Sequence, residues 1–319
     1  MYPKISVIVP NYNHDTFLER CILSVIDQDY PNKELIVIDG GSTDNSVEII
    51  KRHSQHITFW VSERDKGTFE ANNKGLRKMS GDYWSVLNAD DVLLPGALRT
   101  VAEAIEQNPG VKWLTGGSLR YDSNDQVIGE MSPVEPVPVA GYTFLASCWI
   151  DHPSTFLHRS VVEDVGPFDA YHLMDYDYWL RMEAAGYSPY LIQKMLSAQR
   201  VHEGSKSFNA VKLHEEFFKL MTSFCEKHGI ETKDARDRLK GQEGHVTRLR
   251  AALLLKANKR FDVLRVLFQF IMRYPATILQ RWPWGFVKRV VLGTRKNDPA
   301  NDERLTGEGT GNWNTLSNS

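Results

Sequence analysis

The chain has 319 residues, 42% of them hydrophobic and 24% charged, an ordinary composition for a soluble globular protein of one large or two ordinary domains. Its net charge of −2 gives the whole chain no nucleic-acid signature, so we expect no nucleic-acid partner. The three cysteines are far apart, which argues against a disulfide framework, and no apolar run approaches the roughly 20 residues of a membrane-spanning helix, so we expect a cytoplasmic protein.

The first part of the chain alternates between strand patterns and helix patterns. Short, β-branched apolar runs predict four buried strands, at residues 4–9, 34–38, 57–61 and 83–87. Apolar residues at helical spacing predict a helix after each of the first three, at residues 15–28, 45–53 and 68–79. This order predicts an α/β fold with parallel strands covered by helices.

The four predicted strands all stop at polar or conformationally special residues, namely Pro10, Asp39, the charged loop 63–67, and Asp90 with Asp91. In open α/β sheets, ligands bind beyond the carboxyl ends of the strands. If the strands are parallel, these four ends lie on one edge of the sheet. Their convergence is a stronger indication of a site than any one of them alone.

The segment Asn88-Ala89-Asp90-Asp91 ends the fourth of these strands. Adjacent carboxylates repel each other unless a cation or a proton separates them. Their oxygens are suitable ligands for Mg²⁺ or Mn²⁺, which can also hold a diphosphate. The alternative is an ordinary turn, because Asn and Asp are common turn residues.

The second part of the chain has a less regular pattern. We expect two further helices, at residues 95–107 and 175–185. Strands are expected at residues 111–114, 154–158 and 196–202, with a hairpin at 119–131. Three prolines in residues 132–140 indicate a loop that crosses the molecule.

After residue 208 the strand patterns end, and helical patterns cover residues 211–239 and 245–271. Residues 245–296 contain twelve Lys or Arg against one acid, Asp262, with aromatic residues between them. This segment is interpreted either as a surface that binds an anionic cytoplasmic membrane, or as a helical cap or dimer contact. Residues 297–319 are polar and are expected to be disordered.

Ten short motifs in residues 4–207 resemble, in order and spacing, those of family 2 glycosyltransferases. They lie at residues 5–13, 24–31, 38–44, 62–67, 72–75, 81–82, 87–91, 152–154, 166–169 and 175–181. The resemblance implies a GT-A fold: a mostly parallel central sheet flanked by helices, with a nucleotide-binding half at about 1–94 and an acceptor-binding half at 95–207. The helical extension at 208–293 and the tail at 294–319 have no part in it.

The resemblance also implies an inverting transfer of a sugar from a nucleotide-sugar donor, usually UDP-linked, to a hydroxyl of a glycan or lipid-linked acceptor in polysaccharide or glycoconjugate biosynthesis. Asp90 would ligate Mn²⁺ or Mg²⁺, with His202 as a further ligand. Asp175 stands where the family places its catalytic base. The residues implied in binding the nucleotide-sugar are Pro10, Tyr12, Asn13, Asp39, Asp65, Lys66, Asn88, Asp91 and Lys206.

Each of these roles has a structural alternative. Asp39 could be a turn residue, and His202 could be a histidine that only satisfies hydrogen bonds. Asp175 could cap the following helix, in which case Asp177 or Asp169 would be the base. Asn88 stands where the family has the first Asp of its Asp-x-Asp motif, and Met174 stands where it has a Glu beside the base.

Two other functions compete with glycosyl transfer. A sugar nucleotidyltransferase would need a glycine-rich, basic loop after the first strand, where this chain has Asn11-Tyr12-Asn13-His14. A non-catalytic nucleotide-sugar-binding protein would lack the base or the metal carboxylate, whereas Asp90 and Asp175 are both present.

Overall fold

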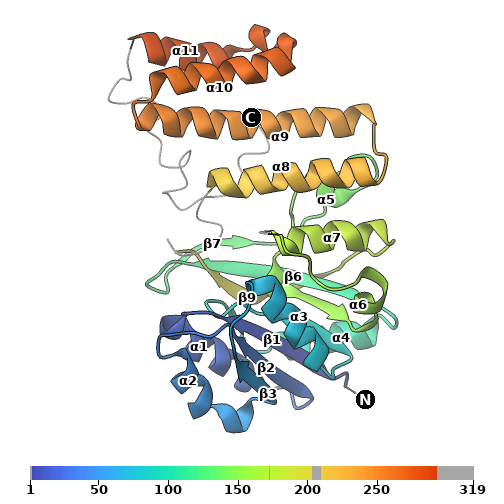
Figure 1. The fold of residues 1–319 in the computed structure, drawn as a ribbon. Helices are drawn as coiled ribbons and strands as arrows, with labels where there is room; N and C mark the ends of the chain where they lie inside the picture. Colours follow the sequence, from blue (N-terminus) through green and yellow to red (C-terminus); the bar gives the residue numbers. More distant parts are fainter. Residues whose placement is uncertain (1, 172, 203–209, 293–319) are drawn as a thin grey trace. The chain divides into compact units, whose positions relative to one another are not determined.

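The computed structural model describes residues 2–171, 173–202 and 210–292, and the chain divides into two compact units, Met1–His202 and Glu203–Ser319 (Figure 1). The first unit is a sheet flanked by helices, and the described part of the second is helical. Each unit is described below by itself.

A single mixed sheet forms the centre of the first unit, in the strand order β3-β2-β1-β4-β8-β6-β9-β5, with β7 paired to β6. Its strands are β1 (Ile5–Asn11), β2 (Lys33–Asp39), β3 (Phe59–Ser62), β4 (Tyr83–Val86), β5 (Val92–Leu93), β6 (Trp113–Tyr121), β7 (Val127–Met131), β8 (Thr155–His158) and β9 (Tyr190–Arg200). The flanking helices are α1 (Asp15–Ile26), α2 (Ser46–Arg52), α3 (Thr68–Lys78), α4 (Ala97–Gln107), α5 (Thr143–Ala146), α6 (Ser160–Val165) and α7 (Met174–Ala184).

Most strands point in the same direction. Strands β1, β2, β3 and β4 are mutually parallel. Strand β8 is antiparallel to both β4 and β6, so β6 runs with β4, and β9 is parallel to β6. The prediction of a mostly parallel α/β sheet is therefore confirmed. The carboxyl ends of β1, β2, β3, β4, β6 and β9 consequently share one edge of the sheet.

The core explains why the first strands are continuous apolar runs. All seven residues of β1 are buried, as are six of the seven in β2, because helices cover both faces of the sheet. Helix α3 approaches β1 most closely at Gly75, where a Cβ atom would lie 2.3 Å from Cγ2 of Ile8. Glycine at this position allows the backbone of the helix to touch the sheet.

The predicted elements of the first unit are present, and the differences concern β5, β9, β6 and the short helices α5 and α6, which the sequence did not predict. Strand β5 was not expected, because two residues are too short to show a pattern. Strand β9 begins at Tyr190 rather than at 196, since the exposed Gln193 and Lys194 interrupt the apolar pattern between its two ends. Strand β6 joins the predicted strand at 111–114 to the first arm of the predicted hairpin.

The second unit contains α8 (Ala210–Lys227), α9 (Lys233–Lys256), α10 (Arg260–Arg273) and α11 (Arg281–Leu292). The predicted helical boundaries are wrong here. Gly229 and Asn258 have φ angles of 62° and 56°, and this left-handed backbone interrupts the predicted runs just after α8 and α9. Among the described helices, none combines the length and apolar character needed to cross a bilayer.

Candidate functional site

Asp39, at the end of β2, organises the loop that follows it. Its buried carboxylate accepts hydrogen bonds from Asn11 Nδ2 at 2.7 Å, Ser62 Oγ at 2.6 Å and Ser42 Oγ at 2.5 Å. It also accepts the backbone N–H groups of Gly41 and Ser42. Burial works to raise the pKa of Asp39, but these hydrogen bonds outweigh it and hold the pKa below its usual range.

The family resemblance implies that Asp39 contacts the nucleotide. In the structure its side chain has no exposed surface, and its carboxylate oxygens accept hydrogen bonds from residues at the ends of β1 and β3 and in the turn after β2. Its observed role is to fix three strand ends and the turn after β2. This geometry agrees with the structural alternative for Asp39, that of a turn residue at the end of a strand.

Hydrogen bonds to the loop after β2 fix the loop between β1 and α1. Asn13, at φ 54°, donates its backbone N–H to Ser42 Oγ at 2.8 Å and accepts the N–H of Thr43 on Oδ1 at 2.8 Å. One residue beyond His14, the N–H of Asp15 donates to Asp44 Oδ2 at 3.0 Å. Of the other residues predicted in this loop, Pro10 is buried in β1 and Tyr12 is 59% exposed.

Asp65 lies in the charged loop after β3, directly against the backbone after Asp39. A Cβ atom on Gly40 would come within 2.8 Å of Asp65 Oδ2, so the glycine leaves room for the carboxylate. Asp65 Oδ1 also accepts the N–H of Gly67 at 2.8 Å. The adjacent Lys66 is exposed, so its ammonium group is accessible at the same edge.

The two adjacent carboxylates after β4 have opposite environments. Asp91 is 1% exposed, accepts the N–H of Arg200 at 3.0 Å and accepts Asn88 Nδ2 at 3.1 Å. Burial and the charge of Asp90 raise the pKa of Asp91 well above its usual range. The sequence assigns Asn88 and Asp91 to the nucleotide-sugar, but the structure pairs them with each other and turns Asp91 into the protein.

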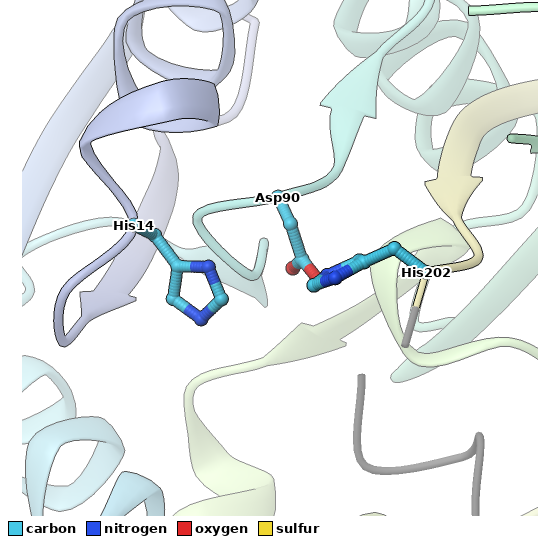
Figure 2. A group of neighbouring side chains, drawn as sticks. All are labelled: His14, Asp90 and His202. Atoms are coloured by element: carbon cyan, nitrogen blue, oxygen red, sulfur yellow. The ribbon is translucent and has the colours of Figure 1, made fainter. Parts of the chain in front are cut away.

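Asp90 faces the other way, toward two histidines (Figure 2). Its Oδ2 lies 3.1 Å from Nε2 of His202, which follows β9. A ligand atom of His14, from the loop before α1, lies within 4.8 Å of both. The side chains of Asp90 and His202 are 15% and 14% exposed, so both are partly screened from solvent.

Carboxylate oxygen and imidazole nitrogen are ordinary ligands of divalent cations, so the donor atoms of Asp90 and His202 are chemically suited to one. The alternative of a merely satisfied histidine also describes the hydrogen bond to Asp90. Lys206, predicted near the diphosphate, lies outside the described residues.

Arg200 holds the end of β9 in place, a role that the sequence did not indicate. Its side chain is 5% exposed, donates to the carbonyl of Asp122 at 2.8 Å and pairs with Asp125 at 2.6 Å. Its guanidinium group also lies 4.6 Å from the centre of the Phe17 ring. Because Val201 and His202 directly follow Arg200, these contacts of the Arg200 side chain restrict the position of His202.

Asp175 is the second residue of α7, whose N-cap is Leu173, so the alternative in which Asp175 caps this helix is wrong. Within the described residues its carboxylate has no hydrogen bond or ion pair. The two rival bases are engaged differently: Asp177 forms an ion pair with Arg181 at 2.8 Å, and the side chain of Asp169 is 60% exposed. Burial raises the pKa of the Cys148 thiol, and the charge of Asp175 raises it further.

A groove of about 700 Å³ lies elsewhere on the first unit, lined by residues 107–112 and 186–190. These residues precede β6 and β9, so the groove is at the amino ends of the strands. Its lining contains no carboxylate. The groove therefore lacks the carboxylates that are found at the opposite edge of the sheet.

The family described as Glycosyl transferase family 2 matches residues 6–128. Glycosyltransferase GlyA of Streptococcus pneumoniae is 38% identical over 104 residues, 32% of this chain and 15% of that protein. An uncharacterized glycosyltransferase of Haemophilus influenzae is 38% identical over 109 residues, 33% of this chain and 44% of its own length. One of Rickettsia prowazekii is 28% identical over 269 residues, 80% of this chain and 81% of its own. The chain thus spans less than half of the first two relatives.

Two solved structures share the fold. The crystal structure of S. aureus TarS 1–349 in complex with UDP-GlcNAc has a TM-score of 0.56 at 16% identity, covering 96% of this chain and 89% of that chain. A mannosyltransferase from Pyrobaculum calidifontis in complex with GDP-Man and Mn²⁺ has a TM-score of 0.57 at 17% identity, covering 93% and 89%. The chain therefore has the GT-A fold of these structures, and its residues 6–128 are similar to glycosyltransferase family 2.

Proposed function

We propose that the protein transfers a sugar, with inversion, from a nucleotide-diphosphate sugar to an acceptor hydroxyl in a metal-dependent reaction. The observation that carries this proposal is the contact of 3.1 Å between Asp90 and His202 at the carboxyl edge of the sheet. This edge is where α/β sheets bind ligands, and the Asp39 and Asp65 loops reach the same edge.

The nucleotide is assigned to residues 1–94 and the acceptor to residues 95–207. Tyr12, Asn13 and Lys66 are exposed and are placed to contact the nucleotide, while Asp39 shapes the loop from within. UDP is the first candidate, because TarS is described with UDP-GlcNAc, and GDP is the second, because the Pyrobaculum mannosyltransferase is described with GDP-Man.

Inverting transfer is a single displacement. The acceptor oxygen forms a bond to the anomeric carbon while the bond from that carbon to the diphosphate oxygen breaks. The nucleoside diphosphate leaves with the electron pair, and the hydroxyl proton passes to a carboxylate. A free carboxylate with no competing partner is best suited to accept it, which favours Asp175 over the ion-paired Asp177.

Asp90 and His202 would hold the cation, which is Mn²⁺ or Mg²⁺. A divalent cation at this position supplies charge neutralisation for the leaving diphosphate. Arg200 and Asp91 support these residues by fixing the end of β9 to the turn after β4. We place the acceptor among glycans and lipid-linked saccharides, in polysaccharide or glycoconjugate assembly.

The test is a thermal-shift screen of UDP-, GDP- and dTDP-sugars with Mn²⁺ or Mg²⁺, followed by measurement of nucleotide release with glycan acceptors. Stabilisation by one nucleotide class, stronger with metal, supports the proposal. Binding without any release or hydrolysis would favour a non-catalytic nucleotide-sugar-binding protein. Release of pyrophosphate from a nucleoside triphosphate and a sugar phosphate would favour a nucleotidyltransferase.

A further part of the proposal concerns α10, which exposes an apolar stripe. Phe261, Leu264, Phe268 and Met272 recur at helical spacing and are 89%, 36%, 63% and 64% exposed. The opposite face of the helix is buried through Val263, Leu267 and Phe270. Exposed Lys259, Arg260 and Arg265 lie on or just before the same helix.

Apolar side chains among cations are complementary to an anionic lipid surface. We therefore propose that the second unit holds the protein peripherally on the cytoplasmic face of a membrane. The full chain should co-sediment with anionic vesicles at low salt and less at high salt. Phe268→Ser should weaken binding, whereas Val137→Ser, at a still more exposed apolar residue of the first unit, should not. Absence of binding at low salt would contradict the proposal.

A further inference from the structure

His14 occupies the N-cap position of α1 with a side chain that the helix does not use. Its backbone carbonyl accepts the N–H groups of Phe17 at 3.0 Å and Leu18 at 2.9 Å, but its side chain makes no capping hydrogen bond. Ser, Thr, Asp and Asn are the residues that stabilise this position. Histidine here therefore contributes little to the helix, and its ring is available for another role.

The ring of His14 is directed toward Asp90 and His202 (Figure 2). The three ligand atoms lie within 4.8 Å of one another, and the rings of His14 and His202 are 6.2 Å apart between centroids. Within the described residues, the structure gives the His14 ring no hydrogen bond. Three separate segments of the chain thus bring one carboxylate and two imidazoles to one point.

The backbone on both sides of His14 is fixed. Asn13 is bonded to Ser42 and Thr43, and Asp15 to Asp44, so the loop after β2 holds the loop before α1. The partner ring is held as well, because Phe17 packs against His202 at 5.3 Å between centroids. These contacts reduce the freedom that ligand binding would otherwise have to remove.

We propose that His14 is a third protein ligand of the divalent cation and that it gives the site a preference for Mn²⁺ and later first-row metals over Mg²⁺. Imidazole suits transition metals, whereas Mg²⁺ prefers carboxylate, carbonyl and water oxygens. A site with one carboxylate and one imidazole distinguishes these ions weakly. A second imidazole shifts the preference toward the ions that accept nitrogen.

The geometry is compatible with a single ion. Adjacent ligands at bonds of about 2.1 Å lie about 3 Å apart, and Asp90 Oδ2 and His202 Nε2 are already separated by 3.1 Å. His14, within 4.8 Å of both, must approach by a small side-chain adjustment. Two imidazoles and a carboxylate leave further coordination positions for phosphate oxygens or water.

The inference rests on the proposed function only in that both require Asp90 to bind a cation. The test therefore measures metal binding by the full chain without nucleotide or acceptor. Free Mn²⁺ is followed by electron paramagnetic resonance during titration, and Mg²⁺ is used as the competitor. Pulsed measurements on bound Mn²⁺ count the imidazole nitrogens that coordinate it.

We expect two coordinated imidazoles in the parent protein and one in His14→Ala. Mutation of residues that only hydrogen-bond to a metal ligand commonly weakens metal affinity by about 10–100-fold. Because His14 is proposed as a ligand itself, His14→Ala should weaken Mn²⁺ binding at least about tenfold. His14→Asp should retain cation binding but reduce the preference for Mn²⁺ over Mg²⁺. The control is His56→Ala, an exposed histidine of the same unit outside the cluster, which should bind Mn²⁺ like the parent. Thermal unfolding verifies that each variant is folded.

A single coordinated imidazole in the parent protein would overturn the inference, as would parental Mn²⁺ affinity in folded His14→Ala. Binding that requires Asp90 but not His14 would leave the proposed function standing and remove the role of His14. Binding that requires both residues, with no transfer from any nucleotide-sugar, would support the inference and contradict the proposed function.

Discussion

The backbone N–H of Arg200 donates a hydrogen bond to Oδ1 of Asp91 at 3.0 Å, joining residues 109 positions apart in the sequence. This bond ties the turn after β4 to the end of β9. Asp90 immediately precedes one partner, and His202 lies two residues beyond the other. The hydrogen bond between the buried residues Asp91 and Arg200 therefore sets the spacing of Asp90 and His202, the partly buried pair that we assign to the cation.

Asp91→Ala should destabilise the first unit and weaken cation binding, although Asp91 touches no cation in our proposal. The substitution leaves the buried N–H of Arg200 without an acceptor, which costs about 1–3 kcal/mol. It also releases the spacing between Asp90 and His202. Chemical denaturation and Mn²⁺ titration of the same preparation measure the two effects.

Asp91→Asn is the matched control for this prediction. Its amide oxygen can still accept from Arg200, and the Asn88 amide can turn over to face the new NH₂ group, so both losses should be smaller. If Asp91→Ala bound Mn²⁺ as tightly as the parent while losing stability, the bond would contribute only to folding.

Asp175→Asn should lower transfer by about 10²–10⁴-fold while leaving nucleotide binding nearly unchanged. An amide keeps the shape of the side chain but cannot accept the hydroxyl proton. Steady-state turnover and nucleotide affinity by calorimetry separate these two effects. Normal turnover in Asp175→Asn would show that another group is the base.

Asp177→Asn provides the comparison, two residues further along α7. Its carboxylate is paired with Arg181 at 2.8 Å, so the substitution should mainly reduce stability. A larger loss of turnover in Asp177→Asn than in Asp175→Asn would reverse the assignment between them.

The shared strand edge could be predicted from the sequence because the buried strands leave unbroken apolar runs that stop at polar residues. Strand β5 could not, since Val92 and Leu93 gain their strand conformation only by pairing with β9. The end of α8 near Gly229 could have been predicted from the sequence, because glycine commonly ends a helix in the left-handed conformation that this residue adopts. The helix predicted over 211–239 nevertheless continues through Gly229.

The candidate site could be predicted only as a set of segments. Asp90 and Asp91 are neighbours in the sequence, and only the fold decides that one faces the histidines and the other Arg200. His14 carries no signal of its own, since a single histidine in a polar loop has no spacing that identifies a ligand. Its position depends on contacts with the loop after β2, which lies 29 positions away in the sequence.

Gly75→Ala should destabilise the first unit by about 1–3 kcal/mol despite the higher helix propensity of alanine. The new methyl group would lie 2.3 Å from Cγ2 of the fully buried Ile8, so α3 must move away from β1. Gly241→Ala in α9 is the control, because nothing lies within 4 Å of its Cβ position and the change should be neutral or stabilising. Thermal unfolding at the parental temperature in Gly75→Ala would contradict the close contact.

Glu34 gives the first unit a defined sensitivity to acid. Its carboxylate is 3% exposed and accepts from Ser6 Oγ at 2.5 Å, Ser80 N at 2.6 Å and Lys4 Nζ at 2.8 Å. Burial works to raise the pKa of Glu34, but the bonds from Lys4, Ser6 and Ser80 outweigh it and lower the pKa to about 2. The folded state therefore binds this proton less readily than the unfolded state, whose glutamate titrates near 4.5.

A depressed pKa of this kind stabilises the fold above about pH 4.5 and loses that contribution as the pH falls toward 2. The contribution at neutral pH is about 1–3 kcal/mol. Glu34→Gln should therefore lower the free energy of unfolding at pH 7, and its difference from the parent should shrink between pH 5 and pH 2. Glu103→Gln, on the exposed side of α4, should show no such trend. A difference for Glu34→Gln that stayed constant across this range would mean that the Glu34 charge does not stabilise the fold.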